Sequence, residues 1–386
     1  MSVPSSSSIW DPRPPRPAWI EVDLGALEHN LRQIRADLPA HIRLLHVIKD
    51  DAYGLGSVEV ARVAVRHGVD GFATFTVGEA LRLRMRDIRT PILLLGERIP
   101  EEFPWLLDHD LTTCVGSLES AQALNAFAQR EQRPVRVHIK INSGMNRFGF
   151  PWRSVGTWAP ALARLSHLEI GGALTHFAQS DELVKTFARQ QLANFQQVVT
   201  VLRQQGIAVP CLHTCNSGGY LDLPEAHGNM VRVGILALGV YPSSVCRRLP
   251  SLRPVMTVKA RITSIQHLEP GDTVGYGMRY RAETPRRIAV LPLGYGDGFP
   301  RVRNEGCALI DGQRAPLVGG TAMDAITVDV TDIPEARAGS EAVLMGRQGA
   351  AEITAHDVAA LKRSVSYDVL AGWRGRLPRI YVQGSP

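Results

Sequence analysis

Lys49 combines a reactive side chain with a well-defined position in this sequence. It follows the apolar run RLLHVI and precedes the loop DDAYGLG, residues 50–56, whose glycines allow tight backbone turns beside a phosphate or a ring. A lysine that ends an apolar strand is a candidate Schiff-base amine, because burial lowers its pKa and frees the neutral nucleophile. The alternative is a structural lysine whose apolar stem is buried while its ammonium group reaches water.

Four further apolar runs lead into polar or glycine-rich segments. Lys140 lies in the run before NSGMNRFG at 142–149, and another run ends at THF, residues 175–177. A third run leads to HTCNSGG at 213–219, and a fourth contains RVGI at 232–235. Backbone N–H groups beside glycine can face a phosphate or an oxyanion. A single Arg or His of this kind is more often structural than functional, but five such segments together indicate a site.

These segments belong to a regular alternation of apolar runs and helical patterns. Helical patterns cover residues 58–67, 79–86, 118–129 and 183–205. Eight strand and helix units predict a (β/α)8 barrel rather than an open sheet, with the active site at the carboxyl ends of the strands. The eight strand candidates are 43–49, 71–76, 91–96, 111–116, 135–141, 169–176, 210–215 and 231–238.

The pattern changes near residue 250 to hairpin-like β-structure. Asp311-Gly312 is a strong hairpin-turn signal, and a single helix is expected at 355–362. The fold class is therefore α/β, with an N-terminal (β/α)8 barrel followed by a mostly β C-terminal domain. We expect a flexible arm over residues 1–17, the barrel over 18–248 and the β-rich domain over 249–386.

The composition is typical of an ordinary globular protein, with 45% hydrophobic and 21% charged residues. The net charge of +6 comes from scattered basic residues, and the densest basic stretch has no aromatic residues among them, so we expect no nucleic-acid partner. The five cysteines match no zinc or disulfide spacing, and we expect no metal. No apolar run approaches ~20 residues, and the N-terminus lacks a signal sequence, so we expect a cytoplasmic protein with no membrane partner.

Several segments resemble, in order, the signature segments of alanine racemases, which depend on pyridoxal-5′-phosphate (PLP). The resemblance covers roughly residues 18–382 and preserves the spacing of the motifs. It implies an enzyme that interconverts L- and D-alanine and so supplies D-alanine, a peptidoglycan precursor. The segments are HVIKDDAYGLG, KINSGMNRFGF, HTCNSG and RVGI in the first part and GDTVGYG, LPLGYGDG, VGGTAMDAITVDVT and GRLPRIY in the second.

The resemblance implies a role for individual residues. Lys49 would form a Schiff base with PLP, and Arg232 would face the pyridine nitrogen of the cofactor. A guanidinium disfavours protonation of that nitrogen, so the cofactor would be a weaker electron sink than in a transaminase. The remaining cofactor-binding residues would be Tyr53, His176, Asn216, Ser217, Gly234 and Ile235.

Racemisation requires two bases on opposite faces of the substrate Cα. By resemblance, these bases are Lys49 and Tyr276. Since they come from different domains, the resemblance also implies a head-to-tail homodimer with shared active sites. Arg147 and Met323 would contact the amino-acid substrate. The residues that support these groups would be Lys140, His213, Tyr295 and Asp324. Lys140 matches a position at which the family has a carbamylated lysine that steadies Arg147, and the alternative is an unmodified lysine that forms ion pairs.

The main departure from the family pattern is Gly375, where a tyrosine is usual. This change keeps a serine racemase, or a racemase of broad specificity, open beside an alanine racemase, unless Trp373 or Tyr220 fills the space. A PLP-binding regulatory protein without catalysis is another alternative, but such proteins resemble the barrel alone. A PLP aldolase or decarboxylase would not be expected to keep GMNR and VGYG together.

Overall fold

A computed structural model describes residues 16–384 of the chain, which form two compact units. One unit is Leu27–Arg253, and the other joins the described residues up to Ala26 with those from Pro254 onward. Most of the expected arm, residues 1–17, lies outside the described part. Within residues 16–384, no helix has the length and apolar character needed to cross a membrane.

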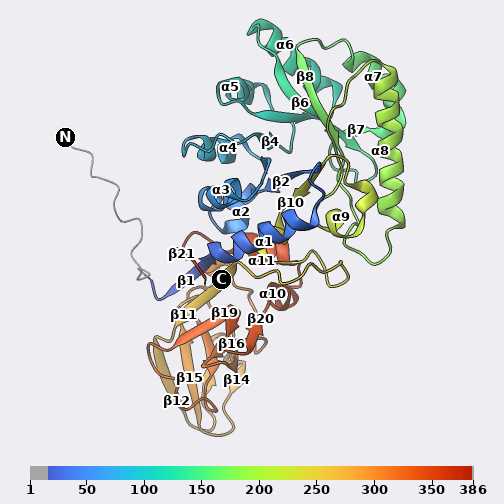
Figure 1. Cartoon of the computed structure of the whole chain (residues 1–386). Helices are drawn as coiled ribbons and strands as arrows, with labels where there is room; N and C mark the ends of the chain where they lie inside the picture. Colours follow the sequence, from blue (N-terminus) through green and yellow to red (C-terminus); the bar gives the residue numbers. More distant parts are fainter. Residues whose placement is uncertain (1–15, 385–386) are drawn as a thin grey trace, which may run out of the picture. The chain divides into compact units, whose positions relative to one another are not determined.

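The first unit contains a parallel sheet in which all eight expected runs form strands (Figure 1). The order of the strands in the sheet is β10-β2-β3-β4-β5-β6-β8-β9, so the last strand of the unit along the chain pairs with the first. A hydrogen bond from the backbone N–H of Arg232 to the carbonyl of Cys215, 3.0 Å long, connects β10 to the segment after β9. The sheet is therefore a nearly closed barrel. The strands are β2 (Arg43–Val47), β3 (Gly71–Thr74), β4 (Ile92–Leu94), β5 (Thr112–Val115), β6 (Val135–Asn142), β8 (Leu168–Leu174), β9 (Leu212–His213) and β10 (Met230–Val233), with the short β7 (Phe150–Pro151) beside β6.

Helices follow most of these strands and lie outside them in Figure 1. Local sequence explains where two of them begin. The side chain of Thr76 accepts a hydrogen bond from the N–H of Glu79 in a capping box, and the side chain of Ser117 caps the next long helix by accepting from the N–H of Ser120. The helices are α1 (Leu24–Asp37), α2 (Lys49–Gly54), α3 (Ser57–Arg66), α4 (Val77–Arg84), α5 (Phe103–Asp108), α6 (Leu118–Arg130), α7 (Val155–Leu162), α8 (Thr186–Gln204) and α9 (Ser217–Asp222).

The inside of the barrel is a packed apolar core below the polar rim. Because side chains alternate along a strand, Leu45 and Val47 of β2 point inward together, while His46 between them points outward. Burial of these inward side chains stabilises the unit. The core cluster comprises Leu45, Val47, Ala73, Leu93, Cys114, Leu174, Cys211 and Met230.

The second unit consists mainly of antiparallel strands (Figure 1). Its largest sheet has the order β17-β16-β19-β11-β1-β21, with β20 beside β19. A three-stranded sheet, β12-β15-β18, and the pair β13-β14 complete it. The strands are β1 (Ala18–Asp23), β11 (Met256–Arg261), β12 (Ser264–Leu268), β13 (Thr273–Val274), β14 (Tyr280–Arg281), β15 (Arg286–Leu291), β16 (Cys307–Ile310), β17 (Gln313–Pro316), β18 (Ile326–Asp329), β19 (Glu341–Gln348), β20 (Ala351–Ile353) and β21 (Arg379–Val382).

Two features of the second unit differ from the sequence-based expectations. Residues 18–23, which we expected in the barrel, form β1 and pair antiparallel with β11 and parallel with β21. The pattern of a strand predicts its buried face but not its partner, and both of these partners lie far away in the sequence. The structure also has two helices where one was expected, α10 (Ala355–Lys362) and α11 (Ser366–Gly372).

The turn predicted at Asp311-Gly312 connects β16 to β17. Both residues have positive φ, 49° and 72°, as a two-residue hairpin turn of the favoured type requires. The prediction is therefore confirmed. The sequence could predict this turn because its geometry depends on only these two residues.

Candidate functional site

Lys49 is the first residue of α2, whose backbone is left-handed. Residues 50–53 all have φ between 52° and 56°, although none of them is glycine. Left-handed backbone costs an L-residue about 1–2 kcal/mol, so the surroundings must hold this turn in place. The carboxylate of Asp51 accepts hydrogen bonds from the N–H and hydroxyl of Ser57 at 2.9 and 2.8 Å, and Glu79 accepts from the N–H of Asp50 at 2.5 Å.

Other cationic side chains lie near the amine of Lys49. Burial lowers the pKa of Lys49, and the positive charge of Arg147 lowers it further, against the opposing effect of Glu79. Burial also lowers the pKa of Lys140, with additional repulsion from Arg232, Arg147 and Lys49. We call Lys49, Lys140, Arg147 and Arg232 the cationic cluster. The lowered pKa values increase the neutral fraction of both lysines, and the combined charge favours an anionic ligand.

Arg232, on β10, is 3% exposed, and its hydrogen-bond acceptors within residues 16–384 are neutral. Its guanidinium donates to the carbonyls of Thr175, His213 and Thr214 at 2.8, 2.7 and 3.0 Å. Burial lowers the pKa of Arg232 to about 10, which still leaves the group charged at neutral pH. The guanidinium therefore has a defined orientation and a charge that its acceptors do not neutralise. Its strand ends at Val233, and a 3-10 turn at 235–238 replaces the expected second half of that strand.

Two histidine rings contact this guanidinium. Nδ1 of His213 lies 3.2 Å from one nitrogen of Arg232, and Nδ1 of His176 lies 3.4 Å from the other. Burial lowers the pKa of both histidines well below the usual value, and the charge of Arg232 adds to the effect on each. Both rings are therefore neutral at pH 7.

The segment after β10 meets the side chain of Tyr53, and the glycine-rich segment after β9 contacts it in turn. The hydroxyl oxygen of Tyr53 would lie 2.5 Å from a Cβ atom at Gly234, so this position tolerates only glycine without movement. The hydroxyl of Ser217 accepts a hydrogen bond from the N–H of Gly234 at 3.2 Å. Asn216 caps α9 by accepting from the N–H of Gly219 at 2.9 Å, and Ile235 is fully buried. Burial raises the pKa of Tyr53, so its phenol stays protonated and can donate.

Lys140 and Arg147 come from β6 and the loop that follows it. Lys140 is 8% exposed and donates to the carbonyl of Leu95 at 2.6 Å, and its amine lies 5.1 Å from the centre of the Phe148 ring. Arg147 is exposed, and its guanidinium lies 5.7 Å from the same ring. These residues line a small cleft together with Thr175 and His176.

Tyr276, in the second unit, has an exposed side chain, with 83% of its surface accessible. It follows Gly275 and precedes Gly277, which have φ of 72° and 75°. Both glycines adopt backbone conformations that disfavour side chains, so the turn at 275–277 directs Tyr276 outward. An exposed tyrosine of this kind is available to contact a substrate or another chain.

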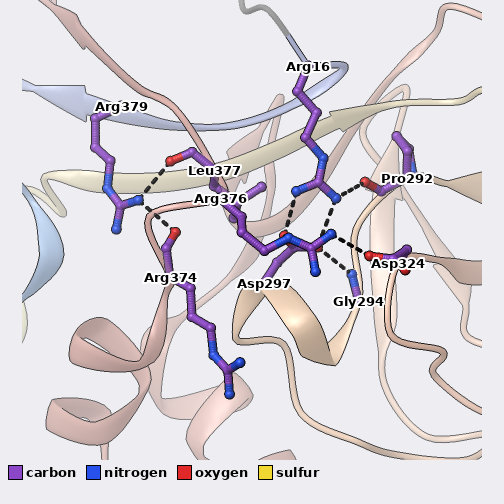
Figure 2. Close-up of polar contacts among 9 residues, drawn as sticks. All are labelled: Arg16, Pro292, Gly294, Asp297, Asp324, Arg374, Arg376, Leu377 and Arg379. Atoms are coloured by element: carbon purple, nitrogen blue, oxygen red, sulfur yellow. Dashed lines mark hydrogen bonds and ion pairs between the residues drawn. The ribbon is translucent and has the colours of Figure 1, made fainter.

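Tyr295, Met323 and Asp324 lie close together in the second unit. The N–H of Tyr295 donates to the carbonyl of Ala322 at 3.0 Å, and the next N–H, of Gly296, donates to the carbonyl of Met323 at 2.9 Å. Figure 2 shows Arg376 between Asp297 and Asp324, with ion pairs to both. The structure therefore brings these three predicted residues into one hydrogen-bonded group.

The position of Gly375 is open. A Cβ atom placed there meets no heavy atom within 4 Å among the described residues. Trp373 is 3% exposed and packs beside Phe299, with 6.3 Å between the ring centres. Tyr220 is in the barrel unit, where its hydroxyl donates to Asp37 at 2.6 Å.

Sequence reasoning missed three residues that support these groups. His138 lies two positions before Lys140 on the same face of β6, and its ring contacts that of His213. The period of two along a strand was the signal that could have identified it. Arg16 and Arg376 bind Asp297, but nothing in their local sequence indicates this distant partner.

Comparisons with known proteins cover nearly the whole chain. The family model for the alanine racemase N-terminal domain matches residues 22–242, and the model for the C-terminal domain matches residues 255–381. Alanine racemase of Halothermothrix orenii is 37% identical over 367 residues, which cover 95% of this chain and 97% of the relative. Alanine racemase of Carboxydothermus hydrogenoformans is 39% identical over 369 residues, which cover 95% of this chain and 100% of the relative.

Solved structures give the same result. Alanine racemase of Clostridium difficile superposes with a TM-score of 0.91 at 35% identity, covering 96% of this chain and 97% of that one. Alanine racemase of Bacillus anthracis, solved with bound L-Ala-P, has a TM-score of 0.90 at 30% identity and covers 98% of this chain and 97% of that one. The chain therefore belongs to the alanine racemase family.

Proposed function

We propose that this protein is a PLP-dependent racemase that interconverts L- and D-alanine. The observation that supports this most strongly is the cationic cluster around Lys49 at the carboxyl ends of the barrel strands, in a chain that belongs to the alanine racemase family. PLP carries a phosphate and a phenolic oxygen, and both groups suit a site with excess positive charge.

The residues of the barrel unit fit this cofactor. Tyr53, Ser217, Gly234 and Ile235 would hold its phosphate, because Gly234 permits a close backbone approach and the tyrosine and serine supply hydroxyl groups. His176 and Asn216 complete this cofactor-binding set. When bound, PLP acts as an electron sink that acidifies the Cα–H bond of an amino acid.

Arg232 would face the pyridine nitrogen of the cofactor. Its contacts with three carbonyls and with His213 hold the guanidinium in one orientation. A charged guanidinium cannot accept a proton, so it disfavours a protonated pyridine nitrogen and moderates the electron sink. A moderate sink would favour return of the proton to the substrate Cα over its uptake at another carbon.

Lys49 and Tyr276 would be the two proton carriers. The lowered pKa of Lys49 raises its neutral fraction, so its amine can accept the Cα proton on one face. Tyr276, with its exposed hydroxyl, would serve the other face. Because Tyr276 belongs to the second unit, we propose a head-to-tail homodimer in which each site uses Tyr276 of the other subunit.

Arg147 and Met323 would contact the substrate, with Arg147 pairing with its carboxylate. Lys140, buried among cations, is suited to carbamylation: its neutral amine adds to the carbon of CO₂ and releases a proton, which leaves an anionic carbamate on the side chain. That anion would offset the repulsion from Arg147 and Arg232. His213, Tyr295 and Asp324 would hold these residues in position.

We also propose that the protein acts in the cytoplasm, without a nucleic-acid or membrane partner.

The open position at Gly375 favours a second candidate, a racemase that also accepts serine. A site with this space could take a longer side chain than that of alanine, and small pockets reject an added hydroxyl only weakly, by about a hundredfold.

Initial rates with single enantiomers of alanine, serine and other amino acids test the activity. We expect racemisation of alanine, and no racemisation of any amino acid would favour the non-catalytic PLP-binding alternative. Borohydride reduction and peptide mapping should locate the phosphopyridoxyl group on Lys49. A group on Lys140, or none, would contradict the cofactor assignment.

A substitution of Tyr276 tests the two-base assignment. Tyr276→Phe removes a proton carrier from one face, so solvent-deuterium incorporation should fall unequally from the two enantiomers. Small and equal losses would mean that Tyr276 is not the second base.

A further inference from the structure

Arg16, just before β1, forms a buried ion pair with Asp297 (Figure 2). Its guanidinium donates to both carboxylate oxygens, at 2.5 and 2.9 Å, and to the carbonyl of Pro292 at 2.7 Å. The side chain of Asp297 is completely buried, and that of Arg16 is 23% exposed. Arg16 therefore attaches the start of β1 to the turn that follows β15.

Asp297 in turn closes the turn that contains Tyr295. Its second oxygen, Oδ2, accepts a hydrogen bond from the N–H of Gly294 at 3.0 Å. Burial raises the pKa of Asp297, but hydrogen bonds from Arg16 and Gly294 outweigh burial, so the pKa lies below its usual value. Asp297 is therefore an anion, and both its charge and its geometry depend on Arg16.

The turn closed by Asp297 holds the backbone of residues 322–323. The N–H groups of Tyr295 and Gly296 donate to the carbonyls of Ala322 and Met323 at 3.0 and 2.9 Å. A Cβ atom at Gly294 would lie 2.1 Å from the carbonyl oxygen of Ala322, so the two segments are in tight backbone contact. A shift of the turn must therefore move Met323.

A second connection passes through Arg376. Its Nε lies 3.4 Å from Asp297, and its terminal nitrogen pairs with the carboxylate of Asp324. Arg376 is about half exposed, and Asp297 is buried, so Arg376 alone cannot replace the two-point contact of Arg16.

We propose that Arg16 is a positioning residue for substrate binding. Through Asp297 it orients the Gly294–Asp297 turn, and through that turn and Arg376 it sets the placement of Met323 and Asp324. This inference rests on the proposed function, in which Met323 contacts the amino acid. The proposed function assigns Arg16 no contact with substrate or cofactor.

Hydrogen exchange tests the connection without reference to activity. In Arg16→Met, we expect the amides of Gly294, Tyr295 and Gly296 to exchange about tenfold faster than in the wild-type holoenzyme, because their acceptors are no longer held in place. Arg347→Met is the matched control: Arg347 is an exposed arginine of the same unit, paired with Glu352 at 3.0 Å, and its loss should leave these amides unchanged.

Kinetics distinguish positioning from general damage. We expect Arg16→Met to raise KM for alanine about tenfold with kcat within about threefold, because Met323 contacts bound substrate. A variant that is merely less stable contains fewer active molecules, which lowers the apparent kcat and leaves KM unchanged. Arg16→Lys keeps the charge but loses the bidentate contact, and we expect an intermediate KM.

The double variant Arg16→Met/Asp297→Asn separates stability from position. Removing both charges leaves no uncompensated carboxylate, so thermal stability should recover relative to Arg16→Met. The contacts of Arg16 with residue 297 and with Pro292 are all still lost, so the raised KM and faster exchange should persist. If Arg16→Met does not fold, the double variant still tests whether Arg16 positions Met323 and Asp324.

Normal KM and normal exchange in folded Arg16→Met, or in the double variant, would overturn the inference. A wild-type protein without racemase activity would contradict the proposed function instead, and the exchange measurement would still test the link from Arg16 to the turn.

Discussion

Nδ1 of His138 lies 2.7 Å from Nε2 of His213, and the two rings meet edge to face. A guanidinium only donates, so Nδ1 of His213 must accept from Arg232 at 3.2 Å, and its proton must be on Nε2. That proton is then donated to Nδ1 of His138. Burial lowers the pKa of His138 to about 4, so both rings are neutral at pH 7 and both carry their proton on Nε2.

We therefore predict Nε2–H tautomers for both histidines, observable by NMR of protein labelled with ¹⁵N-histidine. His138→Ala leaves the buried N–H of His213 without an acceptor and should lower the free energy of unfolding by about 1–3 kcal/mol. His138→Asn, whose amide oxygen can replace Nδ1 as acceptor, should lose less. An Nδ1–H tautomer at His138, or equal losses in the two variants, would contradict this arrangement.

A shared active site predicts complementation between inactive chains. Lys49→Ala and Tyr276→Ala should each be inactive, but a mixture after subunit exchange should recover about one quarter of the wild-type activity, because half of randomly mixed dimers contain both chains and each of these has one intact site. Lys49→Ala mixed with itself is the control. No recovery, with exchange verified by mass spectrometry, would argue against sites that use Tyr276 of the other subunit.

We predict that the open position at Gly375 widens the substrate specificity of the enzyme from alanine to serine. Because a Cβ atom at this position meets nothing within 4 Å among residues 16–384, Gly375→Tyr should fold and should fill the open space. We expect it to lower kcat/KM for L-serine about tenfold more than for L-alanine. Gly156→Tyr, at an open position in α7 of the barrel unit, is the control. An unchanged alanine-to-serine ratio in Gly375→Tyr would rule out a role of this position in specificity.

We predict that His46 makes the folded protein less stable as the pH falls. Burial lowers the pKa of His46 to about 4 from its ordinary 6.5. As pH falls below 6.5, the unfolded chain takes up this proton before the folded chain does, so stability is fully present above pH 6.5 and decreases toward pH 4. The contribution of this one residue reaches about 3 kcal/mol at pH 4.

The comparison is between unfolding free energies at pH 7 and pH 4.5. His46→Asn keeps a donor for the carbonyl of Val233, which accepts from the histidine at 2.9 Å, but cannot take up a proton. Its loss of stability between these pH values should be about 2 kcal/mol smaller than that of the wild type. His356→Asn, at an exposed histidine, is the control. Equal losses in wild type and His46→Asn would refute the prediction.

Local signals in the sequence were sufficient to predict the barrel strands and the turn at 311–312. An apolar run of four to eight residues bounded by Gly, Asp or Pro favours a buried strand, and the alternation of such runs with helical patterns favours the barrel. The polar residues that end these strands converge because parallel strands end at one rim. Lys49, Lys140, Arg147, His176 and Arg232 could therefore be grouped from the sequence alone.

Contacts between residues far apart in the chain were decided only by the tertiary structure. Residues 18–23 were not among the expected strands, and their pairing with β11 and β21 could not be predicted, because strand pairing is a property of two segments. The left-handed backbone at 50–53 opposes the preference of each residue, and only the surrounding hydrogen bonds make it stable. Arg16 has no local feature that indicates its partner, because a buried ion pair requires a carboxylate from which folding has excluded water, and here that carboxylate, Asp297, is 281 residues away.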